Sequence, residues 1–146
     1  LLGLQDLFAT TSEITGKALP AGSAEDSVSF LPALSGKPIV STRAGLIHHS
    51  FSGHFAYRQG KWKLLLAKGS GGWSAPKENQ MPKGSPKAQL YDMEADPGET
   101  RNLYQSHPEI AAKLLAQLES DVARGRSTDG PESRNDTKEI VLWKTR

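Results

Sequence analysis

The chain has 146 residues, of which 36% are hydrophobic and 23% are charged, a composition typical of one globular domain of ordinary size. Eighteen Lys and Arg residues against sixteen Asp and Glu residues give a net charge of +2, which is too small to indicate a nucleic-acid or membrane partner. The longest aliphatic stretch, residues 64–67, is too short to cross a bilayer. The absence of cysteine excludes disulfides, a cysteine-ligated zinc and a thiol-derived nucleophile.

The N-terminal part of the sequence is predicted to be helical. Residues 6–15 predict a helix with Asp6 as its N-cap and a stop at the following glycine. Leu7, Phe8 and Ile14 share one face of this helix, so the face requires an apolar surface to cover it. A loop follows, and residues 26–34 then predict a short helical turn.

The middle of the sequence is predicted to be a sheet. Residues 39–40 and 46–51 have strand character. Residues 55–58 and 62–66 flank a turn at Gly60 and predict a β-hairpin with one covered and one wet face, as in an antiparallel sheet.

A long loop and a further strand follow the hairpin. Residues 68–88 are rich in glycine and proline, and a loop of this length is usually functional or mobile. Residues 89–92 again have the composition of a strand.

The last predicted helix begins near Ser106 and ends at Gly125. Its apolar residues repeat every four positions, which indicates a helix that buries one face against a sheet: Ile110, Leu114, Leu118 and Val122. We therefore predict the α+β class, with a small four-stranded antiparallel sheet packed against one long C-terminal helix. Residues 140–143 favour either an edge strand or a frayed end.

Few residues offer catalytic chemistry. His48 and His49 are adjacent on a predicted strand and point to opposite faces, so they form no joint metal site. The glycines of residues 70–73 expose backbone N–H groups that suit an anion, but the spacing of a nucleotide-binding loop is absent. These residues alone leave the function open.

The order of the segments resembles the C-terminal part of a sulfatase of the arylsulfatase type, in the alkaline-phosphatase-like superfamily. Five segments resemble family signatures in the family's own order: residues 6–16, 26–36, 56–64, 90–103 and the His-Pro-Glu helix start at 107–109. Residues 90–103 resemble the most distinctive of them, L-Y-[DN]-L-x-x-D-P-x-E-x-x-N-L. Residue Ser27 departs from the family pattern, which usually has glycine there.

The resemblance implies a division of the chain. Residues 1–37 would be the trailing segment of the large α/β catalytic domain, which the initial helix would close. Residues 38–126 would be the smaller C-terminal subdomain, and residues 127–146 a tail. Since the sequence starts at Leu1, we expect it to be part of a longer gene product.

The resemblance also implies an activity that this chain lacks on its own. Sulfatases hydrolyse sulfate esters, here of sulfated carbohydrates or aryl sulfates, with a formylglycine made from a C/S-x-P-x-R motif and a calcium ion. This sequence has no cysteine, and the Ser-Ala-Pro-Lys stretch at 74–77 lacks the following arginine. We therefore expect no catalytic residue, no metal ligand and no cofactor here, with calcium and formylglycine belonging to the full-length parent.

In the family the C-terminal subdomain lines one side of the active-site mouth. The resemblance thus implies two substrate-binding segments: His48 with His49, and Ser70, Gly71, Gly72 and Trp73. A histidine can bond a sulfate or a sugar hydroxyl, and a tryptophan can stack on a sugar ring. A periplasmic or secreted location would be usual for the family.

Two alternatives stay open. The chain would also fit a stand-alone carbohydrate- or sulfoglycan-binding module. It would equally fit a protein-interaction fragment that associates with itself through Leu7, Phe8 and Ile14, the face that the missing catalytic domain would cover.

Overall fold

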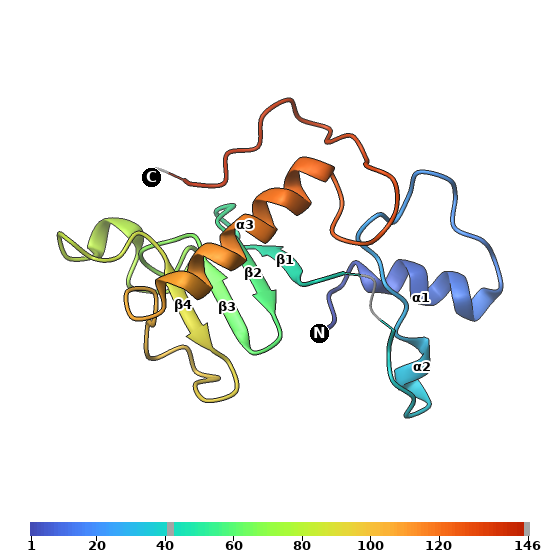
Figure 1. Ribbon diagram of the computed structural model, residues 1–146, viewed down its shortest axis with the longest axis horizontal. Coiled ribbons are helices and arrows are strands. Elements are labelled where there is room, and N and C mark those ends of the chain that lie inside the picture. Colours follow the sequence, from blue (N-terminus) through green and yellow to red (C-terminus); the bar gives the residue numbers. More distant parts are fainter. Residues whose placement is uncertain (41–42, 145–146) are drawn as a thin grey trace. The chain divides into compact units, whose positions relative to one another are not determined.

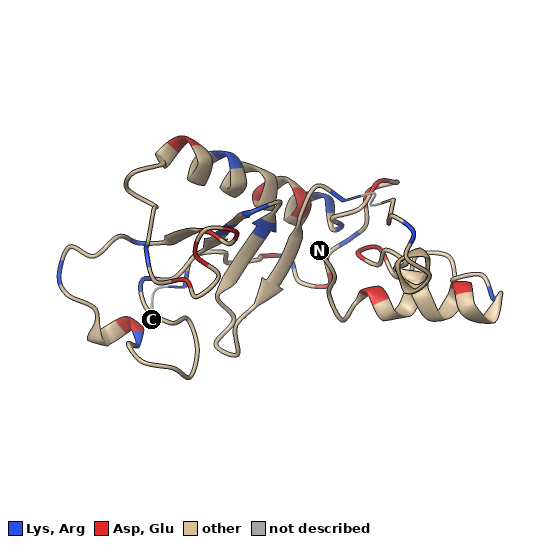
Figure 2. Ribbon diagram, turned by 90° about the horizontal axis from the view of Figure 1, so that it is seen from below, with Lys and Arg blue, Asp and Glu red and all other residues tan. Residues whose placement is uncertain are grey.

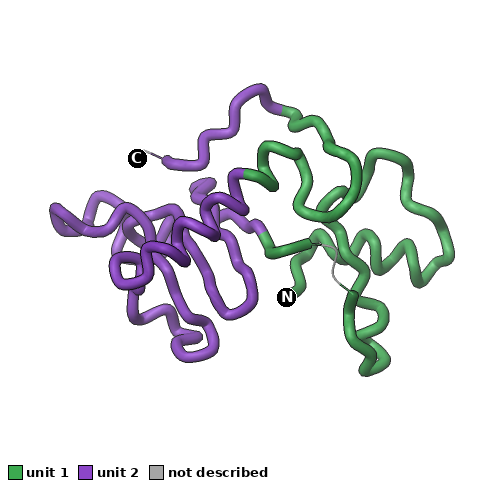
Figure 3. The backbone as a smooth tube through the Cα atoms, in the orientation of Figure 1, with its two compact units in different colours: residues 1–46, 120–136 green, residues 47–119, 137–146 purple. Residues whose placement is uncertain are grey.

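The computed structural model describes residues 1–40 and 43–144. The elements follow in the order α1 (Asp6–Thr15), α2 (Leu31–Leu34), β1 (Leu46–His49), β2 (Phe55–Gln59), β3 (Trp62–Leu65), the 3-10 turn η1 (Glu78–Gln80), β4 (Gln89–Asp92) and α3 (Pro108–Arg124), as Figure 1 shows. The chain forms two compact units (Figure 3): Leu1–Leu46 with Ser120–Asp136, and Ile47–Glu119 with residues 137–146.

The larger unit contains the predicted sheet, with strand order β1-β2-β3-β4. The β2–β3 hairpin is antiparallel, and Gln59 pairs with Trp62 across the two-residue turn Gly60-Lys61. Gly60 has a φ of +54°, a left-handed conformation that glycine adopts without the cost of a Cβ clash. Strand β4 pairs antiparallel with β3, with Leu90 opposite Leu64.

The core lies between the sheet and α3. Tyr57, Leu64 and Leu90 share one face of the sheet and are fully buried. Leu114 and Leu118 of α3 are likewise buried, so the stripe in the sequence is the packed face of the helix. The predicted α+β class, four antiparallel strands and a long helix, is confirmed.

The smaller unit is held together by a buried ion pair. The Arg43 guanidinium makes two 2.6 Å contacts with the Asp6 carboxylate, and both side chains are almost inaccessible to water. The Asp6 carboxylate also accepts the N–H groups of Gly3 and Val28. Gln5 rather than Asp6 is the N-cap of α1, so the carboxylate predicted as a cap is instead the centre of a tertiary network.

Two predicted strands are irregular in the structure. Residues 39 and 40 form no strand, and Val40 is 84% exposed, so this apolar pair is not part of a buried strand. Residues 140–143, for which the sequence left an edge strand and a frayed end open, also have irregular backbone. In this tail the ring centroid of Trp143 lies 4.5 Å from Lys87 Nζ, and Trp143 lines a small cavity together with Leu64 and Leu66.

Basic and acidic residues are interspersed along the described ribbon, in keeping with the low net charge (Figure 2). Within residues 1–40 and 43–144, no helix is both long and apolar enough to cross a bilayer.

Candidate functional site

An open pocket of about 710 Å³ lies in the larger unit. Its walls come from the β1–β2 turn, the loop after β3, the 3-10 turn η1 and the C-terminal tail: Ser52, His54, Gly71, Gly72, Lys77, Glu78, Asn79, Val141, Trp143 and Lys144. Cavities of this size are those that take small molecules, which makes this pocket the candidate site.

The glycine-rich part of the loop folds around a carboxylate of its own chain. Glu78 accepts the backbone N–H groups of Lys68 at 2.8 Å, and of Gly69 and Gly71 at 3.1 Å. Successive backbone N–H groups that converge in this way form a cradle for an anion. In the sequence the glycines of residues 70–73 suit an anion, whereas in the structure the N–H donors are Lys68, Gly69 and Gly71, and they bind the Glu78 carboxylate.

Electrostatics keep Glu78 ionised. Burial alone would raise the pKa of Glu78, but the three N–H donors and the nearby His54 lower it below its ordinary value of 4.5. The carboxylate is thus charged at neutral pH, and its charge is compensated by the loop that it holds. His54 is itself buried, with Nδ1 placed 3.1 Å from the carbonyl oxygen of Leu66.

The predicted loop residues differ in their surroundings: Ser70 and Gly71 make contacts within the chain, whereas the Trp73 ring is exposed. The Ser70 hydroxyl donates to the carbonyl oxygen of Ser74 and accepts the N–H of Gly72. Gly71 is buried against Ala67 and His54, where a Cβ would approach to 3.4 Å, and its φ of +67° also favours glycine. Trp73 is 75% exposed.

The exposed Trp73 has an aromatic neighbour that the sequence analysis missed. Phe51, in the β1–β2 turn, is 77% exposed and lies with its ring centroid 4.6 Å from that of Trp73, at an interplanar angle of 41°. Phe51 and Trp73 are the chain neighbours of the lining residues Ser52 and Gly72. We call these two rings the aromatic pair.

His48 and His49 are outside the lining of this pocket. The His49 ring packs edge-on against Phe55, with centroids 4.1 Å apart. Partial burial lowers the pKa of His49, and Lys144 lowers it further; burial and Lys63 do the same for the pKa of His48. Both rings therefore favour the neutral form, which can donate and accept a hydrogen bond.

The residues do not fit a sulfatase metal or nucleophile. Within residues 1–40 and 43–144, no three His, Asp or Glu side chains are grouped as metal ligands. In the stretch after Ser74, the position of the motif's arginine is occupied by Glu78, which is engaged in the loop.

The polar residues of the late signature have structural roles. Asp96 accepts the N–H groups of Thr100 and Arg101, and so closes the turn. Asn102 accepts the Leu90 N–H of β4 and donates to the carbonyl oxygen of Ala88. The signature therefore fixes the edge of the sheet and does not mark a reaction centre.

Comparison with known proteins connects this fold to a family. A search of protein-family models gives no match. The N-acetylgalactosamine-6-O-sulfatase of Bacteroides thetaiotaomicron is 32% identical over 116 residues, which cover 79% of this chain and 22% of that protein. The chain is homologous to part of a sulfatase.

Solved sulfatases share the fold. A sulfatase of Bacteroides thetaiotaomicron, from work on the metabolism of multiple glycosaminoglycans, matches with a TM-score of 0.62 at 32% identity, over 82% of this chain and 24% of its own. A 2-O glycosaminoglycan sulfatase matches with a TM-score of 0.58 at 24% identity, over the same two shares. The chain thus spans less than a quarter of the length of each of these three sulfatases.

Proposed function

We propose that this chain is the C-terminal part of a sulfatase that hydrolyses sulfate esters of a glycan, and that it supplies a wall of the substrate pocket. The 32% identity to an N-acetylgalactosamine-6-O-sulfatase carries this proposal. In it, residues 1–37 are the trailing segment of the catalytic domain, residues 38–126 form the C-terminal subdomain, and residues 127–146 are its tail.

The chain contributes binding rather than chemistry. Its sequence has no cysteine and its described residues hold no metal cluster, so the formylglycine and calcium of the family would belong to the rest of the parent protein. The residues proposed to contact substrate are His48, His49 and residues 70–73. Trp73 is exposed and free to stack on a sugar, while Gly71 and Gly72 line the pocket.

The coding sequence upstream of Leu1 gives a first test. We expect an in-frame C/S-x-P-x-R motif there, and its absence would contradict the proposal. In the longer enzyme, His49→Ala and Trp73→Ala should raise KM for a sulfated oligosaccharide with little change in kcat, because both contacts are made by bound substrate and transition state alike. An unchanged KM for both variants would exclude these residues as substrate contacts.

A stand-alone glycan-binding module is the second candidate function, and the exposed Trp73 favours it. This second candidate predicts that the protein binds a sulfated glycan and that its gene encodes no catalytic domain. The same upstream sequence separates the two candidates.

A third proposal concerns the partner of α1. Leu7, Phe8 and Ile14 are 51%, 51% and 59% exposed, and we propose that the catalytic domain of the longer protein covers them. The isolated chain should then associate through this face, and a Phe8→Ser variant should remain monomeric in light scattering at concentrations where the wild type associates. A wild-type chain that stays monomeric at every concentration would contradict the self-association.

A further inference from the structure

The geometry points to a subsite for a sulfated pyranose, built from Phe51, Trp73, Lys77 and Lys144. The subsite rests on the proposed function, since it names the ligand chemistry of the same pocket. It adds three residues, from the β1–β2 turn, the start of η1 and the tail, to the substrate contacts inferred from the family.

The aromatic pair provides an apolar platform for a sugar ring. Two neighbouring rings that are each about three-quarters exposed leave a large apolar area in water, which a folded chain rarely does without a ligand or partner. The axial C–H bonds of a pyranose form an apolar face of similar size, and contact with that face removes both surfaces from water.

Two lysines of the pocket supply cations for a sulfate. Lys77 and Lys144 both line the pocket. Lys144 lies next to the β1–β2 turn that carries Phe51, because a Cβ added to Gly53 of that turn would lie 3.5 Å from Lys144 Cε. The two ammonium groups are hydrogen-bond donors with full charge, and they suit the oxygens of an anionic ester.

Glu78 does not cancel this attraction. Its carboxylate accepts three backbone N–H groups, so its charge is satisfied within the loop. Among the described residues, neither Lys77 nor Lys144 forms an ion pair with it. The three N–H contacts hold the loop that presents Trp73. Glu78 is thus a positioning residue for the platform, and it reduces the entropy that the loop would lose on binding.

Titration of the ¹⁵N-labelled 146-residue chain tests the subsite. The probes are a chondroitin 6-sulfate tetrasaccharide, the same tetrasaccharide after chemical desulfation, and sodium sulfate alone. We expect the sulfated sugar to shift the Trp73 indole N–H signal saturably, the desulfated sugar to bind at least about threefold more weakly, and sodium sulfate to leave the signal in place.

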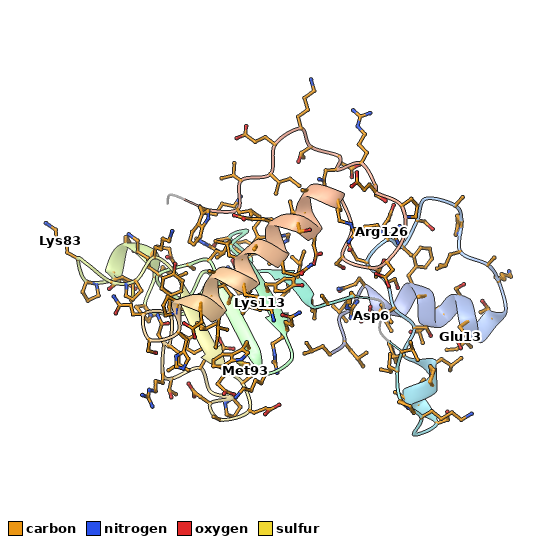
Figure 4. All side chains as sticks on the ribbon, in the orientation of Figure 1. Asp6, Glu13, Lys83, Met93, Lys113 and Arg126 are labelled. Carbon is orange, nitrogen blue, oxygen red and sulfur yellow. The ribbon has the colours of Figure 1, made fainter. Side chains whose placement is uncertain are left out.

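Variants assign the contacts. Trp73→Ala should weaken binding about tenfold and Phe51→Ala about threefold. A Lys77→Gln, Lys144→Gln double variant should remove the preference for the sulfated sugar. Leu34→Ala, at another exposed apolar residue, and Lys83→Gln, at the outlying lysine labelled in Figure 4, are matched controls that should bind like the wild type.

Several outcomes would overturn the subsite. These are no saturable binding, wild-type affinity in both aromatic variants, equal affinity for the two sugars, or a shift of Trp73 by sodium sulfate alone. A well-dispersed amide spectrum for each variant shows that a loss of binding is not a loss of fold. Failure here would leave the upstream motif and sulfate release of the longer enzyme unaffected, so the two proposals fail separately.

Discussion

Replacing Glu78 by Gln should loosen the loop that carries Trp73. The substitution keeps the shape of the side chain but removes its charge and turns one acceptor oxygen into an NH₂ group. That group would face the N–H donors of Lys68, Gly69 or Gly71 that the carboxylate now accepts. The variant therefore tests the internal anion directly.

The expected cost follows from the contacts. A hydrogen bond to a charged group contributes about 1.5–3 kcal/mol, but Gln keeps one acceptor and the partly exposed loop can recover water. We expect the free energy of loop opening to fall by about 2 kcal/mol. This change corresponds to a loss of about 30-fold in the hydrogen-exchange protection of the Gly69 and Gly71 amides.

The pH dependence has a definite sign. Because the folded-state pKa of Glu78 is lowered from 4.5, its stabilisation is complete above that value and is lost as the pH falls through the folded pKa. Protection of Gly69 and Gly71 should therefore decline below about pH 4.5 in the wild type and stay flat in Glu78→Gln.

Amide exchange measured by NMR at several pH values provides the assay. Glu94→Gln is the matched control, since Glu94 is an exposed carboxylate outside the loop. Equal protection of Gly69 and Gly71 in the wild type and Glu78→Gln, at every pH, would refute the role assigned to the carboxylate.

Three further predictions concern residues outside the loop. Asp6→Asn should lower the free energy of unfolding by about 3 kcal/mol in chemical denaturation, because it removes the negative charge that the buried Arg43 guanidinium contacts twice; an unchanged midpoint would contradict this. Asn102→Ala should lower the free energy of unfolding by about 2 kcal/mol in the same measurement, since the Leu90 and Tyr104 N–H groups lose their acceptor. A loss of less than half of that value would show that water replaces the side-chain amide. Lys63→Gln should raise the pKa of His48 in an NMR titration, because it removes a positive charge that lowers this pKa while Glu99, which raises it, remains. A lowered pKa would contradict this. The exposed controls are Glu13→Gln, Gln105→Ala and Lys83→Gln.

Local sequence patterns were sufficient for most of the fold. Gly60 and the alternation in residues 62–66 predicted the hairpin, and the structure closes it with the two-residue turn Gly60-Lys61 rather than with residues 59–61. The four-residue repeat of α3 identified its buried face. Residues 39–40 form no strand, because a short apolar pair has no period of its own and only tertiary contacts decide whether it joins a sheet. For residues 140–143 the sequence left an edge strand and a frayed end open, and their backbone is irregular.

Contacts between residues far apart in the sequence were harder to predict, both in the smaller unit and in the candidate site. Asp6 and Arg43 are 37 positions apart, and the local sequence around either residue does not predict their ion pair. The sequence indicated only that the glycines of residues 70–73 suit an anion, and the structure shows that Glu78 accepts the N–H groups of Lys68, Gly69 and Gly71. Phe51 was missed for the same reason: its partner Trp73 lies on a different loop.

Sulfate release is the measurement that tests the central claim most directly. Ion chromatography would quantify free sulfate from an oligosaccharide that carries N-acetylgalactosamine 6-sulfate, with the 146-residue chain and with the protein that includes the upstream coding sequence. We predict release by the longer protein and none by the chain alone, which lacks the nucleophile and the metal cluster in its described residues. Turnover by the 146-residue chain, or none by the longer protein, would contradict the account.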